Sequence, residues 1–293
     1  MAGSKERLDI VLVNRGFYPS RERAKAAIMA GLVVVNGERI DKAGTKVLQT
    51  ADIVLKGEVH PYVSRGGRKL EQALRYFGFD MSEKIVIDIG VSTGGFTDCA
   101  LQHGAAHVYA VDVGYGQLAW SLRQDPRVTV MERTNFRHLK LSDLSGTRPN
   151  TAVMDVSFIS IRLLMPIIFD ILEPDGVLLT LIKPQFEAGR EKVGKHGIVR
   201  EAQTHKEVLQ TILLAAKQNH FTVEGLTFSP ITGGDGNIEF LAKLVKQDPP
   251  AGDSPETRRL EQQPPTSDDL PEWIDRVVEE AHQALAKKNE EES

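Results

Sequence analysis

The stretch from Ile85 to Thr97, IVIDIGVSTGGFT, decides the fold, because an apolar run leads directly into a cluster of glycines. The apolar, partly β-branched run Ile85–Ile89 predicts a buried strand. Gly90, Gly94 and Gly95 follow it, and glycines at a strand–helix junction let the backbone approach a ligand closely. The spacing differs from the G-x-G-x-x-G of dinucleotide-binding folds. This stretch predicts the start of an α/β domain with a ligand site at its first strand–helix junction.

Strands and helices alternate from this stretch to residue 245. Helical segments such as Thr97–His103 and Thr204–Asn219 separate most of the strands, which predicts a mainly parallel, doubly wound sheet. The second strand ends at Asp112, where an acidic side chain can accept hydrogen bonds from ribose hydroxyls. The seven predicted strands are Ile85–Ile89, His107–Val111, Val128–Met131, Thr151–Met154, Val177–Ile182, Thr222–Phe228 and Ile238–Val245.

A small α+β module is predicted before this domain, over residues 5–59. Apolar residues recur at helical spacing over Leu8–Leu12, and Ser20 can cap a second helix. Asn36 and Gly37 then form the dipeptide that best supplies the two positive φ angles of a tight hairpin. The module therefore reads as a helix pair followed by a small sheet.

Charge is distributed unevenly along the chain. The net charge is −4 overall, but +6 over residues 1–69 and −8 over residues 247–293. Arg21 and Lys25 share a face of the predicted second helix, with Arg23 beside it. We interpret this face as a ridge that contacts phosphates; a solvated helix surface without a partner is the alternative.

The order of residues from Ser20 to Gly37 fits the pattern S-R-x-x-A-x-x-x-I-x-x-G-x-V-x-V-N-G, which resembles the S4 RNA-binding domain. This resemblance implies that the N-terminal module binds structured RNA. The RNA-contacting residues expected on this basis are Arg7, Ser20, Arg21, Arg23, Lys25, Arg65 and Arg68.

An acidic residue on the first strand, followed by G-x-x-x-G-G, resembles the first motif of class I S-adenosylmethionine-dependent methyltransferases. The resemblance implies a Rossmann-like domain and S-adenosyl-L-methionine as cofactor. Asn135 is expected near the adenine, with a simple turn residue as the alternative. The expected cofactor-binding residues are Asp88, Gly90, Ser92, Thr93, Gly94, Asp112 and Asn135.

Four charged residues lie at strand ends or just past the domain junction: Lys69, Asp155, Lys183 and Glu239. The carboxyl ends of neighbouring parallel strands open onto one crevice, so Asp155 and Lys183 are expected to meet there. A lysine in a run as apolar as VLLTLIKPQF is unusual, because isolated lysines are seldom buried. A purely structural pair between Lys183 and Asp155 is the alternative.

In chain order these four residues resemble the Lys-Asp-Lys-Glu tetrad of FtsJ-type ribose 2′-O-methyltransferases. Residues 5–246 as a whole resemble the TlyA family, in which an S4 domain precedes an FtsJ-like domain. The resemblance implies methylation of cytidine ribose in 16S and/or 23S ribosomal RNA. We expect Lys183 to act as general base and Asp155 to orient it, with Lys69 and Glu239 positioning the ribose.

The expected domain boundaries are 5–59 for the S4-like domain, 60–64 for a linker and 65–246 for the methyltransferase domain. Residues 247–293 are expected to form an acidic linker and an amphipathic helix. The apolar positions of this helix predict that it docks on the body or on a partner. These positions are Ile274, Val277, Val278, Ala281 and Leu285.

Composition narrows the function classes. No apolar run approaches the roughly 20 residues that cross a bilayer, and Cys99, as a single cysteine, excludes a disulfide framework or a multi-cysteine zinc site. We expect a cytoplasmic enzyme that needs no metal and acts on ribosomal RNA or ribosomal subunits; its oligomeric state stays open. The alternatives are a non-catalytic RNA-binding or ribosome assembly factor and a hemolysin-like, membrane-active protein.

Overall fold

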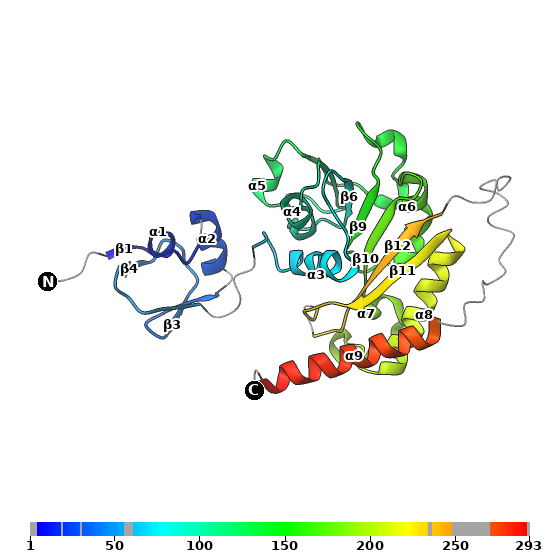
Figure 1. Ribbon diagram of the computed structural model, residues 1–293. Helices are drawn as coiled ribbons and strands as arrows, with labels where there is room; N and C mark the ends of the chain where they lie inside the picture. The colour runs from blue at the N-terminus through cyan, green and yellow to red at the C-terminus, as the bar shows by residue number, and fades with distance from the viewer. Residues whose placement is uncertain are drawn as a thin grey trace. The chain divides into compact units, whose positions relative to one another are not determined.

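The computed structural model describes residues 5–18, 20–29, 31–55, 61–233, 236–247 and 270–291. The chain divides into two compact units, Met1–Pro61 and Tyr62–Ser293 (Figure 1). This division falls within the predicted linker 60–64, of which His60 lies outside the described residues. Within the larger unit, Tyr62 is buried, and its hydroxyl donates a hydrogen bond to Glu71 Oε1 at 2.8 Å.

The N-terminal unit contains the predicted helix pair and hairpin. Ser20 Oγ accepts a hydrogen bond from the backbone N–H of Arg23 at 3.3 Å and so caps the second helix, as predicted. Asn36 and Gly37 have φ angles of +51° and +85°, the positive values that the hairpin requires. The elements are α1 (Leu8–Asn14), α2 (Arg21–Met29), β2 (Val33–Val35), β3 (Glu38–Ile40) and β5 (Ile53–Leu55), with the sheet order β3-β2-β5.

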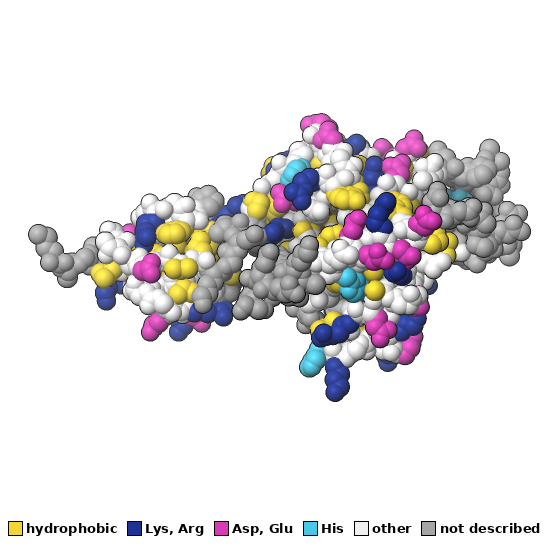
Figure 2. All heavy atoms as spheres, turned by 60° about the horizontal axis from the view of Figure 1, so that its bottom comes forward, with side chains coloured by type: hydrophobic (Ala, Val, Ile, Leu, Met, Phe, Trp, Pro, Cys, Tyr) yellow, Lys and Arg dark blue, Asp and Glu magenta, His cyan; other side chains and the backbone are white. Residues whose placement is uncertain are grey.

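A second, two-stranded sheet in this unit was not predicted. It pairs β1 (Lys5–Arg7) with β4 (Lys46–Leu48) in antiparallel fashion. The apolar faces of the two helices and the three-stranded sheet form one core, in which Leu8, Leu12 and Ile28 are fully buried. Figure 2 shows Lys and Arg side chains at several places on one face of this unit, interspersed with apolar ones.

Seven strands form one sheet in the described part of the larger unit, as predicted. Their order is β11-β12-β10-β9-β6-β7-β8, with β12 antiparallel to both of its neighbours and the remaining pairs parallel. The strands are β6 (Ile85–Ile89), β7 (His107–Val111), β8 (Val128–Met131), β9 (Thr151–Met154), β10 (Val177–Ile182), β11 (Phe221–Phe228) and β12 (Phe240–Lys246).

Helices cover both faces of this sheet, so the unit is a three-layer α/β fold (Figure 1). Val86 packs against the layer of α3, α4 and α5, whereas Ile87 and Ile89 face the layer of α6, α8 and α9. The helices are α3 (Gly67–Phe77), α4 (Gly95–Gln102), α5 (Trp120–Arg123), α6 (Met165–Ile171), α7 (Pro184–Glu187), α8 (Ala202–Gln218) and α9 (Leu270–Glu291), with 3-10 helices η1 (Phe136–His138), η2 (Leu141–Asp143), η3 (Ile161–Leu163), η4 (Arg190–Lys192) and η5 (Lys195–Gly197).

Helix α9 docks on the body of the larger unit, which decides between the two predicted positions for it. Ile274, Val277, Val278 and Ala281 are buried in the same core as residues of α8 and β11. The Leu285 side chain and the acidic stretch 248–269 lie outside the described residues. None of the described helices has the length and apolar character needed to cross a membrane.

Candidate active site

The glycine turn after β6 has a backbone that larger residues would disrupt. Gly90 has φ of +85°, and a Cβ at this position would lie 2.7 Å from the carbonyl oxygen of Asp155. Gly94 has φ of +96°, and a Cβ there would lie 2.3 Å from Cδ1 of Leu122. Both positions therefore require glycine, and the close approach to Asp155 joins the turn to the next strand of the sheet.

Asp112, at the end of β7, is fixed by two backbone amides. Its Oδ2 accepts a hydrogen bond from the N–H of Ser92 at 2.7 Å, and its Oδ1 accepts one from the N–H of Gly114 at 2.7 Å. Ser92 has φ of +48°, a conformation uncommon for non-glycine residues. Each carboxylate oxygen keeps a further lone pair, so the side chain can still accept hydrogen bonds from two ligand hydroxyls.

Asp88 takes a different position from the one expected of a cofactor-binding residue. Its side chain is fully buried and does not line the pocket, and Oδ2 accepts a hydrogen bond from Thr97 Oγ1 at 2.6 Å. Burial raises the pKa of Asp88 to about 7, and Oδ1 has no hydrogen-bond partner among the described residues. Asp88 therefore holds the first turn of α4 through Thr97, from the buried side of the helix.

Asn135 caps a 3-10 helix. Its Oδ1 accepts a hydrogen bond from the backbone N–H of Arg137 at 3.1 Å, at the start of η1. The residue is exposed and does not line the pocket, so its observed contact is that of a turn residue.

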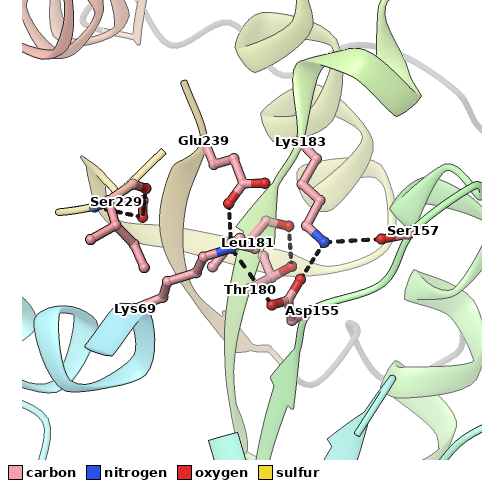
Figure 3. Close-up of polar contacts among 9 residues, drawn as sticks. Lys69, Asp155, Ser157, Thr180, Leu181, Lys183, Ser229 and Glu239 are labelled. Carbon is pink, nitrogen blue, oxygen red and sulfur yellow. Dashed lines mark hydrogen bonds and ion pairs between the residues drawn. The ribbon is translucent and has the colours of Figure 1, made fainter. Parts of the chain in front are cut away.

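The four charged residues expected to carry catalysis come together in one cluster (Figure 3). Asp155 lies between the two lysines: its Oδ1 is 2.5 Å from Nζ of Lys183, and its Oδ2 is 3.9 Å from Nζ of Lys69. Lys69 also donates a hydrogen bond to Glu239 Oε2 at 2.5 Å. Residues separated by up to 170 positions thus form a continuous chain of ion pairs.

Each member of this tetrad is delivered by a different element. Lys69 lies in the first turn of α3, Asp155 follows β9, Lys183 follows β10, and Glu239 immediately precedes β12. Their side chains are 8%, 20%, 12% and 3% exposed, in that order. Buried charges are retained when they are paired, and here two ammonium groups balance two carboxylates.

The tetrad and the glycine turn share one pocket of about 240 Å³. Lys69, Asp155 and Lys183 reach its surface, whereas Glu239 lies behind Lys69 and does not line it. The remaining lining residues are Ser64, Arg65, Gly66, Gly90, Val91, Ser92, Thr93, Gly95, Phe96 and Ser157. The pocket therefore joins a glycine-rich backbone to a pair of ammonium groups.

Sequence reasoning missed Ser157. Its Oγ accepts a hydrogen bond from Nζ of Lys183 at 3.1 Å, so the Lys183 amine has a neutral partner as well as the charged Asp155. Phe186 adds a ring whose centroid lies 5.9 Å from the same nitrogen. The available signal was a hydroxyl two positions after Asp155, but its contact with Lys183 depends on the loop conformation, which the strand pattern does not predict.

Of the two arginines predicted near the domain junction, Arg65 lines the tetrad pocket and Arg68 lines another. That pocket, of about 550 Å³, also involves Arg75. The two predicted arginines therefore point into separate hollows of the larger unit.

The basic residues of the N-terminal unit are organised by a carboxylate that the sequence analysis did not single out. Asp9 is fully buried; its Oδ1 accepts a hydrogen bond from Nε of Arg7 at 2.9 Å, and its Oδ2 accepts one from Arg21 at 2.9 Å. The Arg7 guanidinium lowers the pKa of Asp9 to about 2. Arg23 and Lys25 are half-buried on α2. The arginines at positions 7 and 21 are thereby held together at the surface.

Comparisons with known families match both units. The FtsJ-like methyltransferase family matches residues 62–246, and the S4 domain family matches residues 6–54. Both matches agree with the domain types that the sequence patterns predicted.

Curated proteins and solved structures are similar over most of the chain. The candidate rRNA methyltransferase YqxC of Bacillus subtilis is 52% identical over 98% of both chains. The 16S/23S rRNA (cytidine-2′-O)-methyltransferase TlyA of Mycobacterium tuberculosis is 40% identical over 83% of this chain and 91% of its own. A solved structure, described as a candidate hemolysin from Streptococcus thermophilus, is 49% identical with a TM-score of 0.74, covering 99% of this chain and 100% of that one.

Proposed function

We infer that this chain, which belongs to the TlyA family of S4 and FtsJ-like methyltransferase proteins, methylates the 2′-hydroxyl of cytidine ribose in 16S and/or 23S ribosomal RNA. S-adenosyl-L-methionine is the proposed methyl donor. One observation carries the proposal: the amine of Lys183 and the glycine turn after β6 open onto the same pocket. Transfer of a methyl group to a weakly acidic hydroxyl requires a base and a bound methyl donor at the same pocket.

The residues around the glycine turn fit the cofactor. A Cβ at Gly90 or Gly94 would clash with neighbouring atoms, so the turn needs glycine at both positions, and the backbone of Gly90 and Gly95 lines the pocket. Asp112 is the proposed acceptor for the ribose hydroxyls; it does not line the pocket itself, but it holds the backbone N–H of Ser92, which with Thr93 lines the pocket next to the turn. When bound, the cofactor supplies a methyl carbon that its positively charged sulfur makes electrophilic. Asp88 contributes by anchoring α4.

Lys183 is the proposed general base. Its ammonium group must first release a proton to solvent; the resulting neutral amine then takes the proton of the ribose 2′-hydroxyl, which makes that oxygen a better nucleophile. Asp155 and Ser157 hold Nζ in place, at 2.5 Å and 3.1 Å. Lys69, fixed by Glu239, lies on the far side of Asp155 and positions the ribose. Alignment of the reacting groups can lower the activation free energy by a further ~7–11 kcal/mol.

RNA binding is assigned to the S4 unit and to the arginines beside the tetrad. Arg7 and Arg21 are proposed to contact phosphates directly, because guanidinium groups held in fixed positions recognise phosphate well. Arg23, Lys25 and Ser20 extend this surface along α2. Arg65 is proposed to contact the RNA at the tetrad pocket, and Arg68 from the separate hollow that it lines. Because ribosomal RNA is the proposed substrate, the proposed site of the reaction is the cytoplasm.

Labelled S-adenosylmethionine with isolated small and large ribosomal subunits tests the proposal. We expect label in the RNA of one or both subunits, and none with protein-free controls. Binding of RNA and cofactor without incorporation into either subunit or into naked RNA would favour the non-catalytic assembly factor instead.

The name Hemolysin A, carried by a relative from Brachyspira hyodysenteriae that is 43% identical over 82% of this chain, gives the second candidate function. A lysis assay with purified protein and with Lys183→Ala separates it from methyl transfer. Lysis that is equal for both proteins would establish a membrane activity independent of the tetrad.

A further inference from the structure

The loop that follows β9 carries two partners of the Lys183 amine. Asp155 Oδ1 lies 2.5 Å from Nζ of Lys183, and Ser157 Oγ accepts a hydrogen bond from it at 3.1 Å. The loop leaves the sheet after Met154 and returns to regular structure only at η3. The placement of both partners therefore depends on what holds this loop.

The backbone of the loop is strained. Phe158 has φ of +63°, a left-handed conformation that residues with a bulky side chain rarely adopt. Its side chain is 91% exposed, so burial of the ring contributes little to fixing it. Its ring does contact that of Phe186 on α7, with centroids 4.9 Å apart. A strained conformation of this kind persists only where surrounding contacts determine it.

Glu187 supplies two such contacts from α7, the helix that starts directly after Lys183. Its Oε2 accepts a hydrogen bond from Ser160 Oγ at 2.6 Å, and its Oε1 accepts one from the backbone N–H of Ile161 at 2.8 Å. Ser160 is the N-cap residue of η3 but makes no side-chain capping bond of its own. A carboxylate on a different element thus caps η3 and ends the loop.

Partial burial disfavours the charged form of the Glu187 carboxylate. The side chain is half-buried, and burial raises its pKa although both hydrogen bonds act in the opposite direction. A half-buried charge is retained where its hydrogen bonds compensate for lost solvation. Both side-chain contacts of Glu187 go to the end of the loop that carries Asp155 and Ser157.

We propose that Glu187 is a positioning residue for methyl transfer, which ties the 155–160 loop to α7 and so keeps Asp155 and Ser157 in register with Lys183. This inference rests on the proposed function. Glu187 lies four residues after Lys183, so the short helix that begins at the base also holds the loop that orients it. Small displacements of a base from its partners are sufficient to lower turnover.

Two substitutions of Glu187 and one control test the proposal in the full-length protein. Glu187→Ala removes both contacts and should lower kcat roughly 10- to 100-fold, with cofactor Kd changed less than twofold. Glu187→Gln can still accept from Ile161 and donate to Ser160, so it should restore most of the turnover. Asp143→Ala removes a comparable carboxylate from η2, where Asp143 Oδ2 accepts from the N–H of Lys140 at 2.8 Å, and should leave kcat unchanged.

A double-mutant cycle separates positioning from general structural support. If Glu187 acts through the loop, Ser157→Ala combined with Glu187→Ala should lower kcat by clearly less than the product of the single effects. Multiplicative effects, or equal losses in Glu187→Ala and Asp143→Ala, would overturn the proposal. So would normal turnover in Glu187→Ala. Wild-type protein that transfers no methyl group to ribosomal RNA would instead refute the proposed function.

Discussion

Each unit contains one carboxylate that forms ion pairs with two cationic side chains. The cationic side chains are mostly buried in the larger unit and about half exposed in the N-terminal unit. Asp155 lies between Lys69 and Lys183, whose side chains are 8% and 12% exposed. Asp9 holds two arginines whose side chains are 44% and 52% exposed. A carboxylate paired with two cations therefore lies at a pocket in the larger unit and at the surface in the N-terminal unit.

The difference follows from the chemistry of the two cations. A lysine ammonium can release a proton, and the neutral amine can then accept one from a substrate, so a lysine can serve as a general base. An arginine stays charged in proteins, but its planar guanidinium matches phosphate oxygens. This contrast is the reason that we propose proton transfer for the lysines on Asp155 and RNA binding for the arginines on Asp9. The predictions below test this division.

Lys183→Ala should have the largest effect. Loss of the base is expected to lower the rate of methyl transfer by ~10²–10⁴-fold, since general base catalysis contributes that much. Cofactor affinity, measured by calorimetry, should stay within a few-fold of wild type because the glycine turn is untouched. Near-normal turnover would show that the pocket lysine has only a structural role.

Glu239→Ala should cost the most stability. It leaves the Lys69 ammonium buried, with the 3.9 Å contact to Asp155 as its one remaining ion pair among the described residues, and breaking a buried pair costs ~3–5 kcal/mol. Urea unfolding measures the loss. A Lys69→Met, Glu239→Leu double variant should recover much of the stability without recovering turnover; recovery of both would remove this pair from the mechanism.

Asp9 should make the N-terminal unit sensitive to acid. Its pKa is lowered to about 2, so its stabilising contribution is complete above its ordinary value near 4 and is lost as pH falls toward 2. Because the arginines are partly exposed, we expect only about 1–2 kcal/mol. Urea unfolding of the full chain from pH 2 to 7 should show this loss in wild type but not in Asp9→Asn. Parallel curves for the two proteins would contradict it.

Arg21→Ala should have the smallest effect. It removes one proposed phosphate contact, so RNA affinity should fall several-fold, and the slope of log K against log salt should decrease by roughly 0.7–0.9. Filter binding at several salt concentrations provides the measurement, with Arg276→Ala on α9 as the matched control. An unchanged slope would place the RNA elsewhere.

Most of the sheet could be predicted because its strands are apolar runs between glycines and polar turns. Five of the seven strand ranges match the structure, and the other two differ by one or two residues at their ends. The sheet of β1 and β4 was missed because its strands are three residues long and carry exposed charges. Helix α3 was missed because it starts within S-R-G-G-R-K, which resembles a loop.

The meeting of Asp155 and Lys183 could be predicted from strand ends, because a doubly wound sheet brings those ends together, whereas Lys69, on helix α3, and Glu239 were expected there only from the resemblance to the FtsJ-type tetrad. Asp88 fits the sequence pattern of a cofactor site, yet its side chain points into the core toward Thr97. Ser157 and Glu187 could not be found this way, since their roles depend on a loop conformation and on contacts between elements. Patterns locate the ends of strands, but they do not show which way a loop turns.

The position of the new methyl group tests the central claim most directly. Ribosomal RNA from subunits incubated with the protein and S-adenosylmethionine is digested to nucleosides and analysed by mass spectrometry. We predict 2′-O-methylcytidine with wild type, and at most a trace with Lys183→Ala. Methylation on a base, or ribose methylation that is equal for both proteins, would contradict the assignment of Lys183 as the group that activates a ribose hydroxyl.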